Sequence, residues 1–299
     1  MKRYLLLAGM VVCLLSACGA QEEPSANVPL PDPDASVQLP SPPPQERILY
    51  TLSESDREET VQTDTGVVLL TSRYGLPVLN AHRSDGSAIV EAGTEMEKAA
   101  LAAVGAFNEK FTDWSDEGDQ EGDLAQIAAE DYAWRSQEGI EWVGSYTTEL
   151  ECTTYQTQHM VSVSGLYYSY TGGAHGNSVY LAWNFDLDNG AFFGPELLGG
   201  GELQAAVTEE LKRQCAQRAA EYGMEPGEFF WQDYETILAD WQSYAISFDE
   251  DGMSVNYSPY ELAAYAAGGQ CFEISYEFLK PYLSLQGQHL LGLVEEPGA

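Results

Sequence analysis

Apolar residues recur at helical spacing in two long segments of the chain. Residues 96–111 carry apolar side chains on one helical face, after a Thr94–Glu97 pair that has the form of a capping box. Residues 201–222 repeat apolar side chains every four positions, which predicts an amphipathic helix. Shorter helical segments are expected at 124–132, 229–240, 258–261 and 276–283.

A period of two predicts strands elsewhere. The alternation is most regular at 161–167 and 179–185, on both sides of a glycine-rich segment, so we expect a long antiparallel pair with Trp183 and Phe185 in its buried row. Further strands are expected at 48–54, at 67–74 bounded by Gly75 and Pro77, at 146–156, at 244–248 and 253–257 joined by an Asp251-Gly252 turn, and at 271–276. The pattern predicts an α+β fold: an antiparallel sheet with helices packed on one side, preceded by a disordered tether.

The first residues have the form of a lipoprotein signal peptide. Lys2 and Arg3 precede an apolar run, and Leu15-Ser-Ala-Cys18 follows it. We therefore expect residues 1–17 to be removed and Cys18 to carry the lipid that anchors the protein outside the cytoplasm. The alternative is an ordinary secretory signal that is cut elsewhere. No later segment is apolar enough to predict a membrane span.

Residues 18–46 form the expected tether, a lipid-anchored linker. Eight of the 14 prolines lie in 19–46, together with five carboxylates and no basic or aromatic residue. Such a composition buries too little apolar surface to fold and favours an extended, polyproline-like chain. Residues 47–190 and 191–299 are then the N-terminal and C-terminal parts of the folded domain.

The chain is strongly acidic, with 13 Lys and Arg against 47 Asp and Glu and a formal charge of −34. This balance excludes nucleic acid and direct adhesion to anionic lipid, because phosphate contacts need clustered basic residues. It suits a basic partner or a cation, although a soluble acidic surface without a partner explains it equally well. The acidic run 113–123 lacks the ligand spacing of a helix-loop-helix calcium site, so we expect a solvated connection there.

The remaining cysteines limit the disulfides that can form. Cys152, Cys215 and Cys271 follow Cys18, so at most one disulfide forms within the mature chain. The pair Cys215 and Cys271 is favoured because both lie in the C-terminal half. Three free thiols are the alternative.

Motifs for catalysis or metal binding are missing from the sequence. It contains no Gly-x-Ser-x-Gly, and its four histidines are scattered, without a zinc-binding pair in the sequence. We expect no catalytic residue, no metal and no cofactor. The 18 tyrosines and six tryptophans suit a stacking surface for cell-wall glycan or for a protein.

The sharpest candidate segment is Thr171-Gly-Gly-Ala-His-Gly-Asn177. Its glycines permit a tight turn and a close approach of backbone. His175 is then either exposed for ligand recognition or bonded to backbone to fix the turn, and we favour the structural role. The candidate ligand-binding residues are Gly172, Gly173, His175, Gly176 and Asn177.

Several short motifs, in order, resemble a known family. They are Tyr170-Thr-Gly-Gly-Ala-His-Gly-Asn177, Asn184-Phe-Asp-Leu187, Gly252-Met-Ser-Val-Asn-Tyr257, Pro259-Tyr-Glu261 and the segment 271–282. Over Val67 to Leu283 the chain is similar to the extracytoplasmic domain shared by RsiV-type anti-sigma factors and PdaC-type peptidoglycan deacetylases.

The resemblance implies an α+β domain that senses or binds a ligand at the cell envelope. Lysozyme is the ligand of the RsiV-type relative, and its positive charge would suit this acidic chain. We therefore expect a non-catalytic envelope lipoprotein that binds a basic protein such as lysozyme, or a cell-wall glycan. The alternative is a peptidoglycan-acting enzyme or an accessory domain of one.

Overall fold

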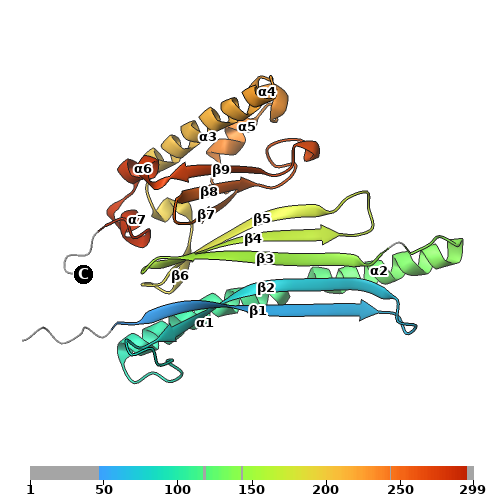
Figure 1. Ribbon diagram of the computed structural model, residues 1–299, viewed down its shortest axis with the longest axis horizontal. Helices are drawn as coiled ribbons and strands as arrows, with labels where there is room; N and C mark the ends of the chain where they lie inside the picture. The colour runs from blue at the N-terminus through green and yellow to red at the C-terminus, as the bar shows by residue number, and fades with distance from the viewer. Residues whose placement is uncertain (1–46, 117–118, 143, 243, 295–299) are drawn as a thin grey trace, which may run out of the picture. The chain divides into compact units, whose positions relative to one another are not determined.

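The computed structural model describes residues 47–116, 119–142, 144–242 and 244–294, which belong to one compact unit from Glu46 onward. Two sheets with helices packed against them form the α+β fold that the sequence predicts (Figure 1). The predicted signal peptide, Cys18 and the linker lie outside the described residues, as do the side chains of the acidic run 113–123. Among the described helices, none is both long and apolar enough to cross a membrane.

The larger sheet has six strands in the order β1-β2-β3-β4-β5-β6. Neighbouring strands are antiparallel except β2 and β3, which are parallel because two helices, α1 and α2, form the connection between them. The strands are β1 (Leu49–Gln62), β2 (Val68–His82), β3 (Tyr146–Gln156), β4 (Met160–Tyr170), β5 (Asn177–Asp186) and β6 (Ala191–Phe193), and the helices are α1 (Glu95–Asp116) and α2 (Asp119–Glu138).

The predicted antiparallel pair is confirmed as β4 and β5, with Val161 opposite Phe185 and Val163 opposite Trp183. Phe185 is fully buried, and Phe107 of α1 packs against its ring at a centroid distance of 5.3 Å. The predicted capping box also forms, because the Glu97 amide donates to Thr94 Oγ1 and the Thr94 amide donates to Glu97 Oε2, each at 3.2 Å. Helix α1 thus starts where the sequence predicts and covers the apolar face of this sheet.

The smaller sheet is antiparallel, with the order β7-β8-β9, and includes the predicted hairpin. Helix α3 (Gly201–Glu221) covers one face, and its repeating apolar residues are fully buried. The remaining elements are η1 (Pro195–Leu197), α4 (Pro226–Phe229), α5 (Tyr234–Ala239), β7 (Ala245–Phe248), β8 (Gly252–Tyr257), η2 (Tyr265–Ala267), β9 (Gln270–Ser275), α6 (Tyr276–Leu279), η3 (Lys280–Tyr282) and α7 (Leu285–Leu290).

Side-chain bonds to backbone join the two sheets. Asn184 Nδ2 on β5 donates to the Ile246 carbonyl on β7 at 2.9 Å. The Phe248 amide donates to Ser162 Oγ on β4 at 2.8 Å. Each of these side chains is buried, so both bonds are shielded from water and hold β7 against β4 and β5.

Several boundaries differ from the sequence prediction. Strand β2 continues through Gly75 and Pro77 to His82, paired with β1. Strand β3 pairs with β2 only as far as Tyr74, so the missing amide of Pro77 interrupts no hydrogen bond between β2 and β3. The helix expected at 124–132 is longer, spanning α2, and α7 was not predicted. Residues 258–261 form a turn rather than a helical segment, with Tyr260 at a φ of 74°.

The prediction of a disulfide between Cys215 and Cys271 is also wrong. Cys152, Cys215 and Cys271 are free thiols, which was the alternative. Cys215 is buried with Phe272 in the core beneath α3. Because side chains alternate along a strand, Cys271 faces the opposite side of β9 from its neighbour Phe272. The two sulfur atoms therefore point to different faces of the sheet.

Candidate functional site

The glycine turn, residues 171–176, connects β4 and β5 and contains most of the candidate residues predicted from the sequence. Gly173, His175 and Asn177 are exposed, and Asn177 begins β5 opposite Ser169. The structure therefore brings the five predicted residues together at one end of the larger sheet. Cys18, the predicted lipid attachment residue, lies outside the described residues.

At two positions of this turn, the structure explains why the residue is glycine. Gly172 has a φ of 82°, and a Cβ atom there would lie 3.2 Å from the Tyr146 ring. Burial, and then the charge of Asp131, raises the pKa of the Tyr146 hydroxyl. Gly176 lies under the Tyr168 ring, which a Cβ atom would overlap. Glycine at these two positions therefore shapes the turn.

His175 is exposed and also fixed in place. Its Nδ1 donates to the Gly176 carbonyl at 2.9 Å, and its ring stacks on Tyr265 with centroids 3.8 Å apart and an interplanar angle of 20°. The Tyr265 hydroxyl donates to the same Gly176 carbonyl at 2.8 Å. The hydrogen bond from His175 to backbone, expected for a structural role, is present. The Tyr265 ring covers one face of the imidazole, and this contact was not predicted from the sequence.

An aromatic face continues from this contact, formed by His175, Tyr265, Tyr260 and Trp231. Tyr260 lies 5.2 Å from Tyr265 between ring centroids, and the Trp231 indole N–H donates to the Tyr260 carbonyl at 2.9 Å. Tyr260 is 56% exposed and Trp231 is 38% exposed. The positive φ of Tyr260 is a costly conformation for a tyrosine.

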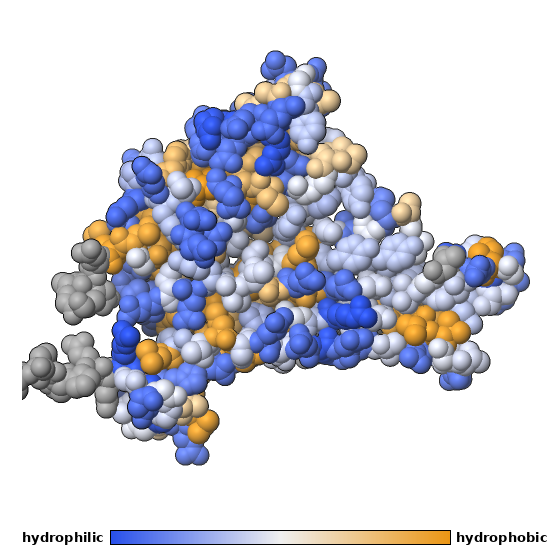
Figure 2. Space-filling view, viewed as in Figure 1, coloured by the Kyte–Doolittle hydropathy of each residue, from blue (hydrophilic) through white to orange (hydrophobic). Residues whose placement is uncertain are grey.

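The stretch of chain that carries the aromatic face is acidic. Residues 136–279 contain 22 Asp and Glu but only three basic residues besides histidine, namely Lys212, Arg213 and Arg218. All three are engaged on α3. Lys212 pairs with Glu209 and Glu235, Arg213 pairs with Glu210, and Arg218 lies 4.3 Å from the centre of the Phe272 ring. Figure 2 shows hydrophilic residues gathered over α3, at the top of that view.

One family model matches the C-terminal part of the chain. Residues 196–277 match the DUF3298 family model, described as a protein of unknown function. This segment contains Trp231, Tyr260 and Tyr265, and also the Gly252–Tyr257 motif, one of those that carry the sequence resemblance. No curated protein matches the chain.

Two solved structures of DUF3298 proteins are similar to this chain. A family member from Bacteroides fragilis has 20% sequence identity and a TM-score of 0.54, and the match covers 79% of this chain and 94% of that one. A protein from Pseudomonas aeruginosa has 12% identity and a TM-score of 0.41, over 80% and 96% of the two chains. At this identity, the first comparison supports the fold alone.

A second cluster was not anticipated from the sequence. His159, Asp188 and His289 lie together, with His159 Nδ1 and His289 Nε2 each 2.9 Å from Asp188 Oδ2. The two imidazole rings are 3.6 Å apart between centroids. These residues are 29 and 101 positions apart along the chain, so no local motif could have revealed them.

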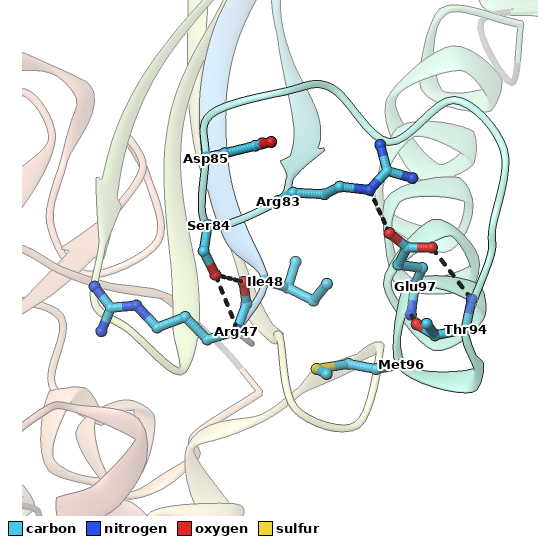
Figure 3. A pocket seen from close by; sticks show the side chains of 8 residues that line it. All are labelled: Arg47, Ile48, Arg83, Ser84, Asp85, Thr94, Met96 and Glu97. Carbon is cyan, nitrogen blue, oxygen red and sulfur yellow. Dashed lines mark hydrogen bonds and ion pairs between the residues drawn. The ribbon is translucent and has the colours of Figure 1, made fainter. Parts of the chain in front are cut away.

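Several polar groups of a small cavity near the start of α1 bond to one another (Figure 3). The cavity measures about 250 Å³ and is lined by Arg83 and Glu97, whose Nε and Oε1 atoms are 2.5 Å apart. The Gly93 amide and then the Arg83 guanidinium lower the pKa of Glu97. Figure 3 shows Arg47 directing its guanidinium away from this pair. We therefore assign this cavity to the closure of the helix start and not to ligand binding.

Proposed function

We propose that this chain is a lipid-anchored, non-catalytic binding or sensing protein of the cell envelope. The aromatic face is its ligand-binding surface, and a basic protein such as lysozyme is its ligand. One observation carries the proposal: exposed aromatic rings lie within a stretch of chain that has 22 carboxylates and three engaged basic residues. The sequence resemblance to RsiV-type domains adds support for this ligand.

Exposed aromatic rings and carboxylates together suit cationic side chains. A Lys or Arg of the partner can lie over the face of Tyr260 or Trp231, with a gain of about 0.5–1 kcal/mol at an exposed site. The long-range attraction between opposite charges also speeds association. Because Lys212 and Arg213 are already paired with carboxylates, they do not repel such a partner strongly.

The non-catalytic part of the proposal rests on how His175 is held. Its Nδ1 is bonded to a backbone carbonyl and one ring face is stacked, which favours a residue that shapes the surface. The Nδ1–H bond and the stack on Tyr265 both hold the turn against η2, so the contacts of this ring are accounted for by structure.

A cell-wall glycan is the second candidate ligand, because tyrosine and tryptophan rings also stack on sugars. The exposed rings of Tyr260 and Trp231 favour it as much as they favour a protein. The salt dependence of binding distinguishes the two ligands. Attraction to a basic protein is screened as salt rises, whereas stacking on an uncharged sugar changes little.

The test uses the compact unit from Glu46, titrated calorimetrically with lysozyme and with solubilised wall glycan. We expect lysozyme to bind at about 50 mM salt and more weakly at about 300 mM salt, as charge screening requires. Replacing the exposed ring in Tyr260→Ala should weaken binding, while Tyr282→Ala, a 40% exposed tyrosine on η3, serves as the matched control. Absence of lysozyme binding at micromolar concentration in either buffer rejects that partner, and salt-independent glycan binding supports the second candidate.

The lipid anchor is tested separately in cells. Cys18→Ser should release the protein from the membrane fraction, because the lipid is attached through this thiol. An unchanged membrane fraction for Cys18→Ser contradicts the proposed anchor and leaves the ligand test unaffected.

A further inference from the structure

Two of the four histidines converge on one carboxylate from three separate parts of the fold. His159 lies in the turn between β3 and β4, Asp188 in the turn between β5 and β6, and His289 on α7. The His159 side chain is only 12% exposed, whereas Asp188 and His289 are 46% and 41% exposed. The cluster is thus anchored in the protein on one side and reachable from solvent on the other.

We propose that His159, Asp188 and His289 form a binding site for one divalent transition metal ion such as Zn²⁺, which fastens α7 to two turns of the six-stranded sheet. Two imidazole nitrogens and one carboxylate oxygen are a ligand set that these ions prefer. The remaining positions on the ion are filled by water.

The separations within the cluster fit such an ion. Ligand atoms about 2.0–2.1 Å from a zinc ion, at angles of roughly 90° to 110°, lie roughly 2.9–3.4 Å from one another. Both nitrogen-to-oxygen distances in the cluster are 2.9 Å, and the three ligand atoms all lie within 4.8 Å of one another. Ligation therefore needs only small side-chain movements.

The two turns hold their ligands in fixed positions. The amides of His159 and Met160 donate to Thr157 Oγ1 at 3.1 Å, and this hydroxyl donates to the Leu290 carbonyl of α7 at 2.7 Å. In the second turn, buried Asp186 accepts the Asp188 amide at 2.9 Å and the Asn189 amide at 3.0 Å. Ligands carried on such preorganised backbone bind metal with a lower ordering cost.

The cluster also opens to solvent space. His159 and Asp188 line a surface depression of about 690 Å³, together with Gln158 and residues of β1 and α1. This space gives an ion an entry path and room for the water molecules that complete its coordination.

The experiment uses the purified full chain, stripped of metal with a chelator and titrated with Zn²⁺ by calorimetry. Excess Mg²⁺ is present, because this hard ion occupies exposed carboxylates but competes poorly for imidazole. We expect one Zn²⁺ per wild-type chain. Wild type without measurable Zn²⁺ binding under these conditions overturns the proposal.

Three variants locate the site. Asp188→Asn retains a carbonyl oxygen that accepts the histidine N–H bonds but is a poor zinc ligand, and His289→Gln removes one nitrogen. Each should weaken Zn²⁺ binding by at least about tenfold, which is the scale of losing even a supporting group of a metal site. The control His82→Gln alters a histidine bonded to Thr51 and should bind like wild type. Equal affinity in Asp188→Asn and wild type overturns the proposal.

A second measurement does not depend on the variants folding. Co²⁺ added to the metal-free wild-type chain should give visible absorption bands of a nitrogen-coordinated ion, which Zn²⁺ then removes by competition. A Co²⁺ spectrum that is the same as that of the ion in water also overturns the proposal.

Discussion

The imidazole of His175 stacks on the ring of Tyr265 at 3.8 Å, although 90 positions separate the two residues. The contact joins the glycine turn of the larger sheet to η2, which precedes the last strand of the smaller sheet. Because the Tyr265 hydroxyl and His175 Nδ1 both donate to the Gly176 carbonyl, the turn and η2 hold each other in position. The aromatic face therefore depends on both sheets.

Loss of this contact should destabilise the fold. His175→Ala removes an aromatic pair, and such pairs contribute about 0.5–1.5 kcal/mol. Tyr265→Phe removes one hydrogen bond, with an expected cost of about 1 kcal/mol. Urea unfolding monitored by circular dichroism measures both, and Tyr222→Phe, whose ring is 65% exposed, is the control. A His175→Ala chain with unchanged stability and lost ligand binding would show that recognition, and not structure, is the main role of His175.

Two adjacent glycines should respond differently to alanine. Gly172 has a φ of 82° and little space beside Tyr146, so Gly172→Ala should cost about 1–2 kcal/mol. Gly173 has no positive φ, and the nearest atom to an added Cβ would be 3.8 Å away. Gly173→Ala should therefore be neutral or stabilising by up to about 1 kcal/mol, through a less flexible unfolded chain. Equal losses for the two variants would show that the turn is constrained as a whole.

Local sequence patterns predicted most of the fold because local interactions determine those elements. Three patterns can each be recognised from residues that are close together in the sequence. They are the Thr94–Glu97 capping box, the alternation of β4 and β5, and the four-residue repeat of α3. The errors have non-local causes. Pro77 was expected to end a strand, yet β1 pairs past it, and Tyr260 adopts a positive φ where Pro259 suggested a helix start.

The candidate sites were less predictable than the fold. The glycine turn was identified because several glycines around a histidine are visible in one segment. Tyr265 and Tyr260 contact it only after the second sheet folds, and His289 reaches Asp188 across 101 positions. Aromatic and histidine counts indicated that such groups exist, but only the packing of the two sheets shows which of them meet.

The free thiols give a test by chemical modification. Burial raises the pKa of Cys215 to about 12, and burial followed by the charge of Glu54 raises the pKa of Cys152 to about 12. Both should resist a thiol reagent near pH 8 in the native compact unit, since the thiolate is the reactive form. In denaturant without reductant, all three thiols of this unit should react. One reactive thiol per chain, instead of three, would show that a disulfide links the other two cysteines.

The same two thiols should make stability fall in alkali. Above the unfolded thiol pKa of about 8.5, the unfolded chain loses protons that the folded chain retains, so the free energy of unfolding falls as pH rises toward about 12. The Cys215 contribution alone should approach about 1.4 kcal/mol per pH unit, measured as the difference in slope between wild type and Cys215→Ala. Equal slopes between about pH 9 and 10.5 would contradict a buried, protonated Cys215.

Substitution of Tyr260 should affect ligand binding and stability differently, because the backbone of this residue is strained while its ring is exposed. At a φ of 74°, a non-glycine residue costs about 1–2 kcal/mol relative to glycine, so Tyr260→Gly should lose the ring with little or no loss of stability. If the aromatic face binds the ligand, the same variant should weaken binding several-fold, as removal of an aromatic contact worth about 1 kcal/mol requires. Thermal unfolding and calorimetric titration on one preparation give both quantities. Ligand affinity equal to wild type in a stable Tyr260→Gly chain would place the binding surface elsewhere, whereas a large loss of stability would show that the ring packs into the fold despite its exposure.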